Sequence, residues 1–286
     1  MELVAIGGDL RYAHMVRLAR QEGMEAKALG LERSGVTGVP TADWADVERA
    51  ASIVMPNPFA KGLMLPFSGR IFPWAELEGH LCAGTRLCLF GPGEAPEAIR
   101  ARHPIVRLCR DEALTRALAR QTAEGAIAAA VQRADYELYG CPVLIVGYGR
   151  IARSLHKMLS GYDALVTVAA RREEVRAQAR AAGARAVDLV QMEALLPGVR
   201  MVFSTPPERV LDGERVQRLR TDALLVDLSS PPYGVDLEAA QARGVDAWRE
   251  PALPGRYCPE SAGAAMLTAV RRAMTDHSHS VLGICE

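Results

Sequence analysis

The sequence has no excess of charge of either sign and no long apolar run. Its 34 Lys and Arg residues equal its 34 Asp and Glu residues, so the formal net charge is zero. A neutral chain has no overall field that would draw it to nucleic acid or to an anionic membrane. No apolar stretch is long enough to span a bilayer, and the start, MELVAIGGD, leads into a predicted strand rather than a signal peptide. We therefore expect a cytoplasmic protein with no nucleic-acid or membrane partner.

The spacing of metal ligands is also missing. The six cysteines form no Cys-x-x-Cys pair, and no histidines stand at the spacing of a zinc site. Four of the cysteines lie in or beside apolar segments, where reduced core thiols are usually found. We expect no metal site.

The chain does contain a regular alternation of short apolar runs and helical segments. In the first hundred or so residues, the runs LVAIGG, MEAKALG, ASIVMP, TRLCLFG and PIVRLC predict strands. After residue 136, strands are predicted at 143–146, 165–169 and 185–188, and in MVFST, LLVDLS and VDAWR. Such alternation is typical of α/β folds with parallel, doubly wound sheets.

An Ala-rich segment without proline separates the two α/β regions and predicts a bridging helix. The expected organisation is an N-terminal α/β domain with the substrate cleft at residues 1–112, the bridging helix at 113–135, a Rossmann dinucleotide-binding domain with a closing helix at 136–276, and a flexible tail at 277–286. The predicted fold class is therefore α/β, with two doubly wound parallel-sheet domains joined by a long helix.

The segment VLIVGYGRIARSLHKML places Gly147, Gly149 and Ala152 on the pattern Gly-x-Gly-x-x-Gly/Ala, between a predicted buried strand and an amphipathic helix. Gly147 permits the tight turn, Gly149 lets the backbone approach a pyrophosphate, and Ala152 lets the helix pack on the strand. The helix start, at Arg150 and Ile151, offers N–H groups and positive dipole to the phosphates. The segment predicts a dinucleotide site. The alternative is a glycine turn in an α/β protein that binds no nucleotide.

Two arginines follow the next predicted strand, in AARRE at residues 169–173. A domain that uses NAD usually has an acidic residue here, which binds the adenosine ribose and would repel a 2′-phosphate. Arg171 and Arg172 instead offer guanidinium groups, which bind phosphate in a bidentate manner. Because cations at a helix start oppose the helix dipole, we expect an anion to compensate them. The pattern favours NADP over NAD, with Arg171 as the main contact. In the alternative, both side chains are simply solvated.

Loops after later strands are expected to line the rest of the cofactor, because ligands of doubly wound sheets bind at the carboxyl ends of the strands. The segments STPPE and DLSSPP are small, polar and stiffened by proline. The predicted contacts from these loops and from the last loop are Ser204, Thr205, Pro206, Asp227, Leu228 and Pro254. For any one of these residues, an ordinary turn is an equally good interpretation.

Several segments together resemble the dehydrogenase-like subunits of dipicolinate synthase, a family of spore-forming bacteria. The matching stretches are GGDLRY, TAEGAI, VLIVGYGRIARSL, VTVAARR, LLVDLSSPPYGVD and PALPGRYCPESAG, in the family's order and over nearly the whole chain. The glycine-rich segment occurs in many dehydrogenases, whereas GGDLRY, TAEGAI and LPGRYCPESAG are more specific. The sequence departs from the family at residues 118–121, where Asn-x-x-Pro is common, and at Ser261, where Thr is expected.

This resemblance implies an enzyme of spore formation that oxidises dihydrodipicolinate, derived from the diaminopimelate and lysine pathway, to dipicolinate with NADP as hydride acceptor. It also implies a partner, the flavoprotein-like second subunit of dipicolinate synthase. We further expect a homo-oligomer.

A substrate with two carboxylates needs cations and N–H donors around it. In GGDLRY, Gly8 gives close backbone approach and Arg11 a guanidinium, whereas a helix cap is the simpler role for Asp9. The predicted substrate-binding residues are Gly8, Asp9, Arg11, Asn57, Thr122 and Arg256, and the candidate catalytic residues are Glu124, Arg11 and Lys61.

The proton acceptor is less well defined by the sequence. Aromatisation of the product favours proton loss, so a modest base such as Glu124 suffices. A salt bridge from Glu124 to Arg120, one helical turn away, is the alternative. The segment PNPFAKG, which holds Asn57 and Lys61, is equally consistent with a proline-stiffened loop.

Two other functions remain open. One is an NADP-dependent oxidoreductase that acts on shikimate, an amino acid or a hydroxy acid. A hydroxy-acid enzyme would need a histidine with an acidic partner, and the last third of the chain before the tail contains no histidine. The other is a chain that binds NADP to regulate or scaffold a catalytic partner, since no obvious acid–base pair is visible in the sequence.

Overall fold

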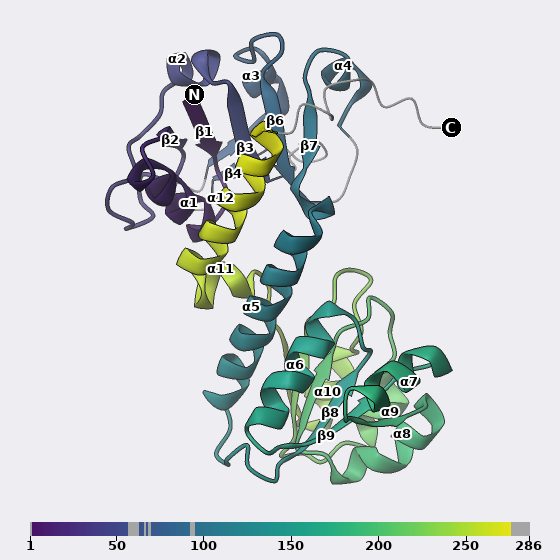
Figure 1. The fold of residues 1–286 in the computed structure, drawn as a ribbon. Helices are drawn as coiled ribbons and strands as arrows, with labels where there is room; N and C mark the ends of the chain where they lie inside the picture. The colour runs from purple at the N-terminus through teal and green to yellow at the C-terminus, as the bar shows by residue number, and fades with distance from the viewer. Residues whose placement is uncertain (1, 57–62, 66, 68–69, 92–94, 276–286) are drawn as a thin grey trace. The chain divides into compact units, whose positions relative to one another are not determined.

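The computed structural model describes residues 2–56, 63–65, 67, 70–91 and 95–275. The chain divides into two compact units (Figure 1). Unit 1 comprises Met1–Leu118 and Pro254–Glu286, and unit 2 comprises Ala119–Leu253. Helix α5 (Glu112–Val131) begins in unit 1 and ends in unit 2, and the chain returns to unit 1 within the short helix α11 (Leu253–Tyr257).

Unit 1 is built on a parallel sheet with the strand order β2-β1-β3-β6-β7. Its strands are β1 (Glu2–Ile6), β2 (Glu25–Leu29), β3 (Ser52–Pro56), β6 (Arg86–Phe90) and β7 (Ile105–Arg107), and a separate antiparallel pair joins β4 (Leu63–Leu65) to β5 (Arg70–Phe72). Leu3 and Ala5 of β1 belong to one core, whereas Val4 and Ile6 belong to another. Both faces of the sheet are therefore buried, which explains why its strands read as unbroken apolar runs.

Helices cover both faces of this sheet. On one face α1 (Leu10–Gln21) and α12 (Pro259–Thr275) lie side by side (Figure 1). The other core includes residues of α2 (Trp44–Arg49), α3 (Trp74–Glu78) and α4 (Glu97–Arg100). A 3₁₀ turn at Leu108–Arg110 leads from β7 into α5.

The prediction that the closing helix belongs to the dinucleotide-binding domain is wrong, because α12 is part of unit 1. Its buried Ala262, Met266 and Val270 share a core with α1 and β1. A Cβ on Gly263 would lie only 2.7 Å from the backbone oxygen of Arg11, so this glycine permits the close approach of α12 to α1. Helical periodicity predicts such a helix but not which sheet it covers.

Unit 2 is built on a parallel sheet with the strand order β10-β9-β8-β11-β12-β13. In chain order within the unit this is 3-2-1-4-5-6, the order of the dinucleotide-binding folds. The strands are β8 (Pro142–Val146), β9 (Leu165–Ala169), β10 (Arg185–Val187), β11 (Met201–Ser204), β12 (Leu224–Asp227) and β13 (Asp246–Arg249).

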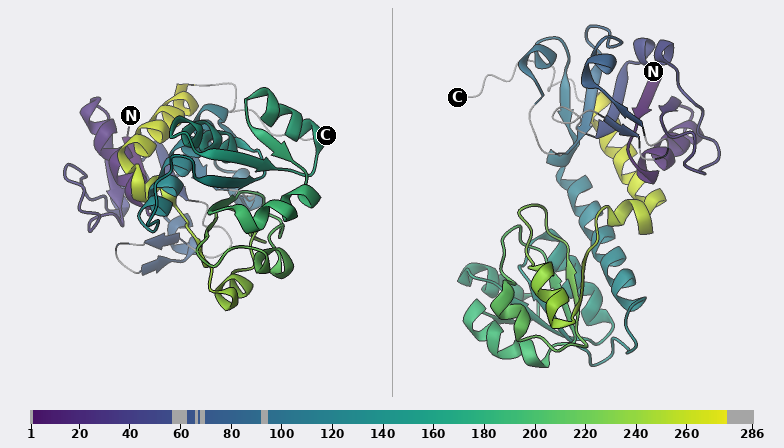
Figure 2. Two further views of the ribbon diagram at one scale, coloured as in Figure 1. Left: turned by 90° about the horizontal axis from the view of Figure 1, so that it is seen from below. Right: turned by 180° about the vertical axis from the view of Figure 1, so that it is seen from behind.

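Helices flank this sheet on both sides (Figure 2). They are α6 (Arg150–Gly161), α7 (Glu173–Ala181), α8 (Leu189–Leu195), α9 (Gly213–Gln217) and α10 (Leu237–Arg243), with a 3₁₀ turn at Leu196–Gly198. Leu144 and Val146 of β8 share a core with residues of α8, α9 and α10, while Val143 and Ile145 are buried on the opposite face. The predicted fold class, two doubly wound parallel sheets, is confirmed in both units. Across the described part of the chain, every helix is too short or too polar to cross a bilayer.

The crossing of α1 and α12 yields a test of unit 1. Gly263→Ala should lower the free energy of unfolding by about 1–3 kcal/mol, because the added methyl group would meet backbone atoms that cannot move separately from their helix. The matched control is Gly161→Ala in α6, where a Cβ has no neighbour within 4 Å and alanine favours the helix. Urea denaturation followed by circular dichroism measures both. Equal midpoints for the two variants would contradict the close crossing.

Candidate functional site

The glycine-rich turn between β8 and α6 contains two glycines with different reasons to be glycine. Gly147 has a φ of +86°, and a Cβ there would lie 2.6 Å from the Thr205 hydroxyl oxygen, so the fold itself requires it. Gly149 has a φ of −78°, and a Cβ there would have no neighbour within 4 Å. Packing therefore does not explain Gly149. Close approach of a pyrophosphate to the first N–H groups of α6 does, and the turn fits a dinucleotide.

A cavity of about 530 Å³ lies at this turn. Its lining includes Gly147 and Gly149 from the turn, Arg171 and Arg172 from the end of β9, and Pro206 and Glu208 from the loop after β11. The size falls within the range of roughly 300–1,000 Å³ that is typical of ligand pockets. The three loops meet here because the carboxyl ends of parallel strands share one edge of the sheet.

Arg171 forms a bidentate ion pair with Glu208 in this cavity. Its Nη1 donates to Oε1 of Glu208 at 2.7 Å, and its Nη2 donates to Oε2 at 2.5 Å. Both side chains are more than half exposed. The anion expected to compensate the arginines is thus present within the chain itself, in a loop 37 residues away. The sequence did not single out Glu208, although this residue ends the segment STPPE.

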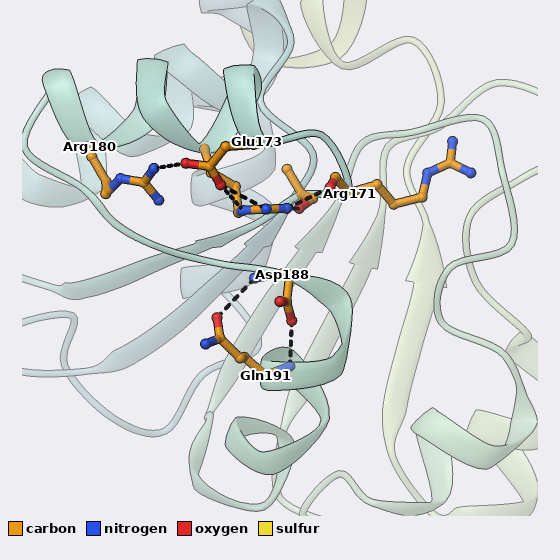
Figure 3. Close-up of polar contacts among 7 residues, drawn as sticks. Arg171, Glu173, Arg180, Asp188 and Gln191 are labelled. Atoms are coloured by element: carbon orange, nitrogen blue, oxygen red, sulfur yellow. Dashed lines mark hydrogen bonds and ion pairs between the residues drawn. The ribbon is translucent and has the colours of Figure 1, made fainter.

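The neighbouring backbone is held by a second arginine. Nη1 of Arg176 donates to the carbonyl oxygens of Ala170, at 2.7 Å, and of Arg171, at 2.5 Å. Glu173 pairs with Arg180 and with Arg176, and the hydrogen bond from Arg180 is the main cause that lowers the pKa of Glu173. Figure 3 shows the Arg171 side chain extending away from Glu173 and Arg180. The acidic first turn of α7 therefore neutralises Arg176 and Arg180 rather than Arg171.

The residue between the two glycines is anchored by its own helix. The Tyr148 hydroxyl lies 3.0 Å from Nδ1 of His156. Burial lowers the pKa of His156 and raises the pKa of Tyr148, so at neutral pH the imidazole is uncharged and the phenol keeps its proton. Tyr148 therefore donates to Nδ1 of His156. The Nε of Arg153 also donates to the Tyr148 carbonyl at 3.2 Å, which fixes the first turn of α6.

Buried polar contacts hold the loop that follows β12. The Asp227 side chain is fully buried and accepts hydrogen bonds from Nε of Arg249 at 3.1 Å and from the Ser229 hydroxyl at 2.6 Å. Ser229 in turn accepts from the backbone N–H of Gly234 at 2.7 Å. A Cβ on Gly234 would lie 2.4 Å from the buried hydroxyl of Ser204. Asp227 and Ser204 thus lie in the interior beneath the loop, and direct cofactor contact by either stays a prediction.

The remaining predicted cofactor residues have the following positions. The Thr205 hydroxyl donates to the carbonyl of Val146 at 2.8 Å, which ties the loop after β11 to β8. The backbone N–H of Leu228 donates to the Ser204 carbonyl at 2.9 Å. Arg150 and Ile151 occupy the first turn of α6, exposed and half-buried respectively. Pro254 is buried in unit 1.

Unit 1 brings two of the more specific sequence segments together. As predicted, Asp9 caps α1 by accepting from the backbone N–H of Arg11 at 3.0 Å. The same carboxylate accepts from Nε of Arg11 at 2.9 Å and from Nη2 at 2.8 Å. A Cβ on Gly255 would lie 2.7 Å from Asp9, so the LPGRY segment approaches GGDLRY here. Gly8, at φ +89°, leaves room for the Tyr12 ring.

The Arg11 side chain is largely buried, with 13% of it exposed, and it stacks over Phe90 with 5.1 Å between the guanidinium carbon and the ring centre. Burial opposes the charged guanidinium. The hydrogen bonds and charge of Asp9 outweigh that effect and raise the pKa of Arg11. Arg11 is therefore a permanently charged, pre-oriented group whose fork is already engaged by a carboxylate of the chain.

The other predicted substrate and catalytic residues do not form one cluster within either unit. Asn57 and Lys61 lie outside the described residues. Thr122, half-buried, and Glu124, exposed, lie on the part of α5 that belongs to unit 2, whereas Arg256 is exposed in unit 1. Among the described ion pairs none joins Glu124 to Arg120, so the salt bridge offered as the alternative role of Glu124 does not form; both side chains are exposed on α5, where such pairs contribute little. Within the described residues, no group of three His, Cys, Asp or Glu side chains is placed to hold a metal ion.

Comparison with known proteins supports this view of unit 2. Residues 107–230 match the model of the family described as D-isomer specific 2-hydroxyacid dehydrogenase, NAD binding domain. The matched segment contains the glycine-rich turn, the two arginines and the loops after β11 and β12. It supports a dehydrogenase-type function and a nicotinamide cofactor.

The resemblance to the first of the dipicolinate synthase subunits is confirmed. The chain is 22% identical to this dipicolinate synthase polypeptide of Bacillus subtilis (strain 168), over 96% of each chain. The crystal structure of its counterpart from Bacillus halodurans covers 96% of this chain and 98% of its own, with 22% identity and a TM-score of 0.81. The corresponding dipicolinate synthase structure from Bacillus subtilis covers 96% and 95%, with 22% identity and a TM-score of 0.77. These structures share the fold of both units.

The two glycines of the turn should respond differently to substitution. Gly149→Ala should keep the unfolding midpoint of the wild type but weaken dinucleotide binding about tenfold or more, because the methyl group would occupy space needed by the pyrophosphate. Gly147→Ala should lower the unfolding midpoint, because of its positive φ and the contact with Thr205. Binding followed by calorimetry, beside thermal denaturation, tests both. Unchanged affinity in Gly149→Ala would show that the turn does not hold a pyrophosphate.

The Tyr148–His156 pair predicts a specific pH dependence. Because burial lowers the pKa of His156, the unfolded chain takes up a proton at higher pH than the folded chain. The stability contributed by the neutral imidazole is present above the unfolded pKa of about 6.5 and is lost as the pH falls below it. His156→Asn should therefore cost about 1 kcal/mol at pH 7.5 and less at pH 5. Denaturant titrations of wild type and variant at both pH values measure this difference, and a cost that grows toward pH 5 would contradict it.

Proposed function

We propose that the protein is the NADP-dependent dehydrogenase component of a dipicolinate synthase, which oxidises dihydrodipicolinate to dipicolinate in spore formation. The observation that carries the cofactor is the pair Arg171 and Arg172, which lines the cavity at the end of β9 where a domain specific for NAD has an acid. Likeness to the dipicolinate synthase chains of Bacillus over both units supports the substrate.

The reaction converts dihydrodipicolinate and NADP⁺ to dipicolinate, NADPH and a proton. When bound, the cofactor supplies the hydride acceptor. The chain's own residues have to hold the reacting ring carbon in place and exclude water. Since aromaticity of the product favours loss of the second hydrogen as a proton, one modest base suffices, and Glu124 is our candidate.

The carboxylates of the substrate are assigned to residues that carry positive charge or expose backbone. In unit 1, Asp9 engages Nε and Nη2 of Arg11, which leaves Nη1 as the donor toward a substrate carboxylate. Arg256 is the second candidate cation, and Gly8 lies beside Arg11 with bare backbone. Asn57, Thr122 and Lys61 complete the proposed substrate set, with Lys61 and Arg11 as charged groups near the reacting ring.

We place the flavoprotein-like second subunit of dipicolinate synthase as the partner, and a homo-oligomer in the cytoplasm as the working form. The Bacillus subtilis relative is named as one of the subunits of a synthase, which supports a partner polypeptide. The lysine and diaminopimelate pathway would supply the dihydropyridine substrate.

The decisive measurement is reduction of the cofactor by purified protein. With dihydrodipicolinate, we expect NADP⁺ to be reduced faster than NAD⁺, in the presence and absence of the flavoprotein-like partner. Shikimate, L-alanine and D-lactate serve as control substrates. If one of these reduces NADP⁺ while dihydrodipicolinate does not, the proposed substrate is wrong. If the protein binds NADP but oxidises none of them, even with the partner, a regulatory or scaffold role replaces the proposal.

Arg171→Glu tests the cofactor assignment separately from the substrate. The variant places a second carboxylate beside Glu208 and removes a charge-assisted contact, so its affinity for NADP should fall about tenfold to a hundredfold more than its affinity for NAD. Its unfolding midpoint should match the wild type because the side chain is exposed. Arg185→Glu, an exposed site of the same unit outside the cavity lining, is the control. Equal losses for NADP and NAD would exclude a contact between Arg171 and the 2′-phosphate.

A further inference from the structure

The guanidinium group that the proposed function assigns to the 2′-phosphate already has an anionic partner. Both Nη atoms of Arg171 donate to the two carboxylate oxygens of Glu208, and both residues line the cavity. This bidentate arrangement is the one that arginine uses for phosphate as well as for carboxylate. One edge of a guanidinium group cannot hold two anions at once, so a phosphate at this corner and Glu208 compete for the same donors.

We infer that Glu208 is a specificity-determining residue that lets the site accept NAD as well as NADP and so limits its preference for NADP. This inference rests on the proposed nicotinamide cofactor. With NADP, Arg171 exchanges Glu208 for the 2′-phosphate. With NAD, Glu208 supplies from the loop after β11 the carboxylate that other domains carry at the end of β9, and it accepts hydrogen bonds from the ribose hydroxyls.

The charges that line the cavity agree with this assignment. Arg171 and Arg172 stand opposite Glu208 and Glu174, so the corner after β9 carries two cations and two anions. The third lining arginine, Arg153, donates to the Tyr148 carbonyl and to Gln178. A corner selective for the phosphorylated cofactor alone would have no reason to set a carboxylate against its main cation. A corner selective for NAD alone would have no reason for the arginines.

The test uses Glu208→Gln, which removes the charge and keeps the shape of the side chain. Adenosine fragments report on the corner without any chemistry, so 2′,5′-ADP and 5′-AMP are titrated beside NADP and NAD. The variant should gain about tenfold in the ratio of affinities for 2′,5′-ADP over 5′-AMP, because Arg171 no longer has a competing anion and the phosphate no longer faces a like charge. NADP over NAD should shift in the same direction.

The matched control is Asp222→Asn. Asp222 is a carboxylate of the same unit with similar exposure, it pairs in a bidentate manner with Arg220 at 2.6 Å for both contacts, and it does not line the cavity. This control should leave both ratios unchanged. A general effect of the charge removed, or a structural disturbance, would move the two nucleotides together and leave the ratio of Glu208→Gln at the wild-type value, which would overturn the inference.

A double-mutant cycle shows whether Glu208 acts through Arg171. In an Arg171→Ala background, Glu208→Gln should change the 2′,5′-ADP to 5′-AMP ratio less than it does in the wild type. An equal change in both backgrounds would overturn competition for Arg171. These outcomes are independent of the substrate. If dihydrodipicolinate fails to reduce either cofactor while the fragment ratios shift as expected, the proposed reaction fails and the inference stands; if NADP is reduced and the ratios do not shift, the reverse holds.

Discussion

Both sheets are parallel and are covered by helices on both faces, and this constraint decides where the chain can place polar chemistry. A strand buried on two sides has no room for a charged side chain, so the charged residues near the sheet collect where strands end. In unit 2 the ends of β8, β9 and β11 lie at one edge, and the cavity there is lined by the glycine turn, two arginines and a glutamate. The fold thus makes the site, and the loops give it its character.

The same constraint explains why some polar residues at strand ends support the site instead of lining it. Asp227 ends β12 as a fully buried carboxylate, and its partner Arg249 ends the neighbouring strand β13. Because a buried carboxylate without a partner would be strongly unfavourable, the pair and Ser229 have to remain together. They fix the loop that follows β12, while Thr205 fixes the loop after β11 to β8. Rigid loops keep the cavity lining in place for a ligand.

The sequence predicts features that depend on neighbouring residues and misses those that depend on distant ones. The strand, glycine turn and helix around Gly147 are local, and their prediction is confirmed in the fold of unit 2. The short helix α2 was not predicted even though Asp43 and Asp46 form a capping box, because six residues show little periodicity. The assignment of α12 was wrong because its place depends on a contact between Gly263 and the backbone of α1, far away in the sequence.

Glu208 illustrates the limit for the candidate site. Two arginines at the start of α7 are unfavourable with respect to the helix dipole, so the sequence correctly indicates a compensating anion. It cannot say whether that anion is a ligand or a side chain, because the pairing of Arg171 with Glu208 requires the parallel order β9-β8-β11 to bring two loops together. STPPE could have been singled out only as a loop with an acid at its end.

A cation that is already paired changes the energetics of binding at the corner after β9. For an unpaired arginine, a phosphate would gain the full charge-assisted contact. For Arg171, the gain is the difference between phosphate and the Glu208 carboxylate, and Glu208 has to be solvated again. Since both partners are more than half exposed, water screens the ion pair, and its loss costs little. The exchange of partners is therefore open to a doubly charged phosphate, and the selectivity that results is smaller than the presence of two arginines alone would suggest.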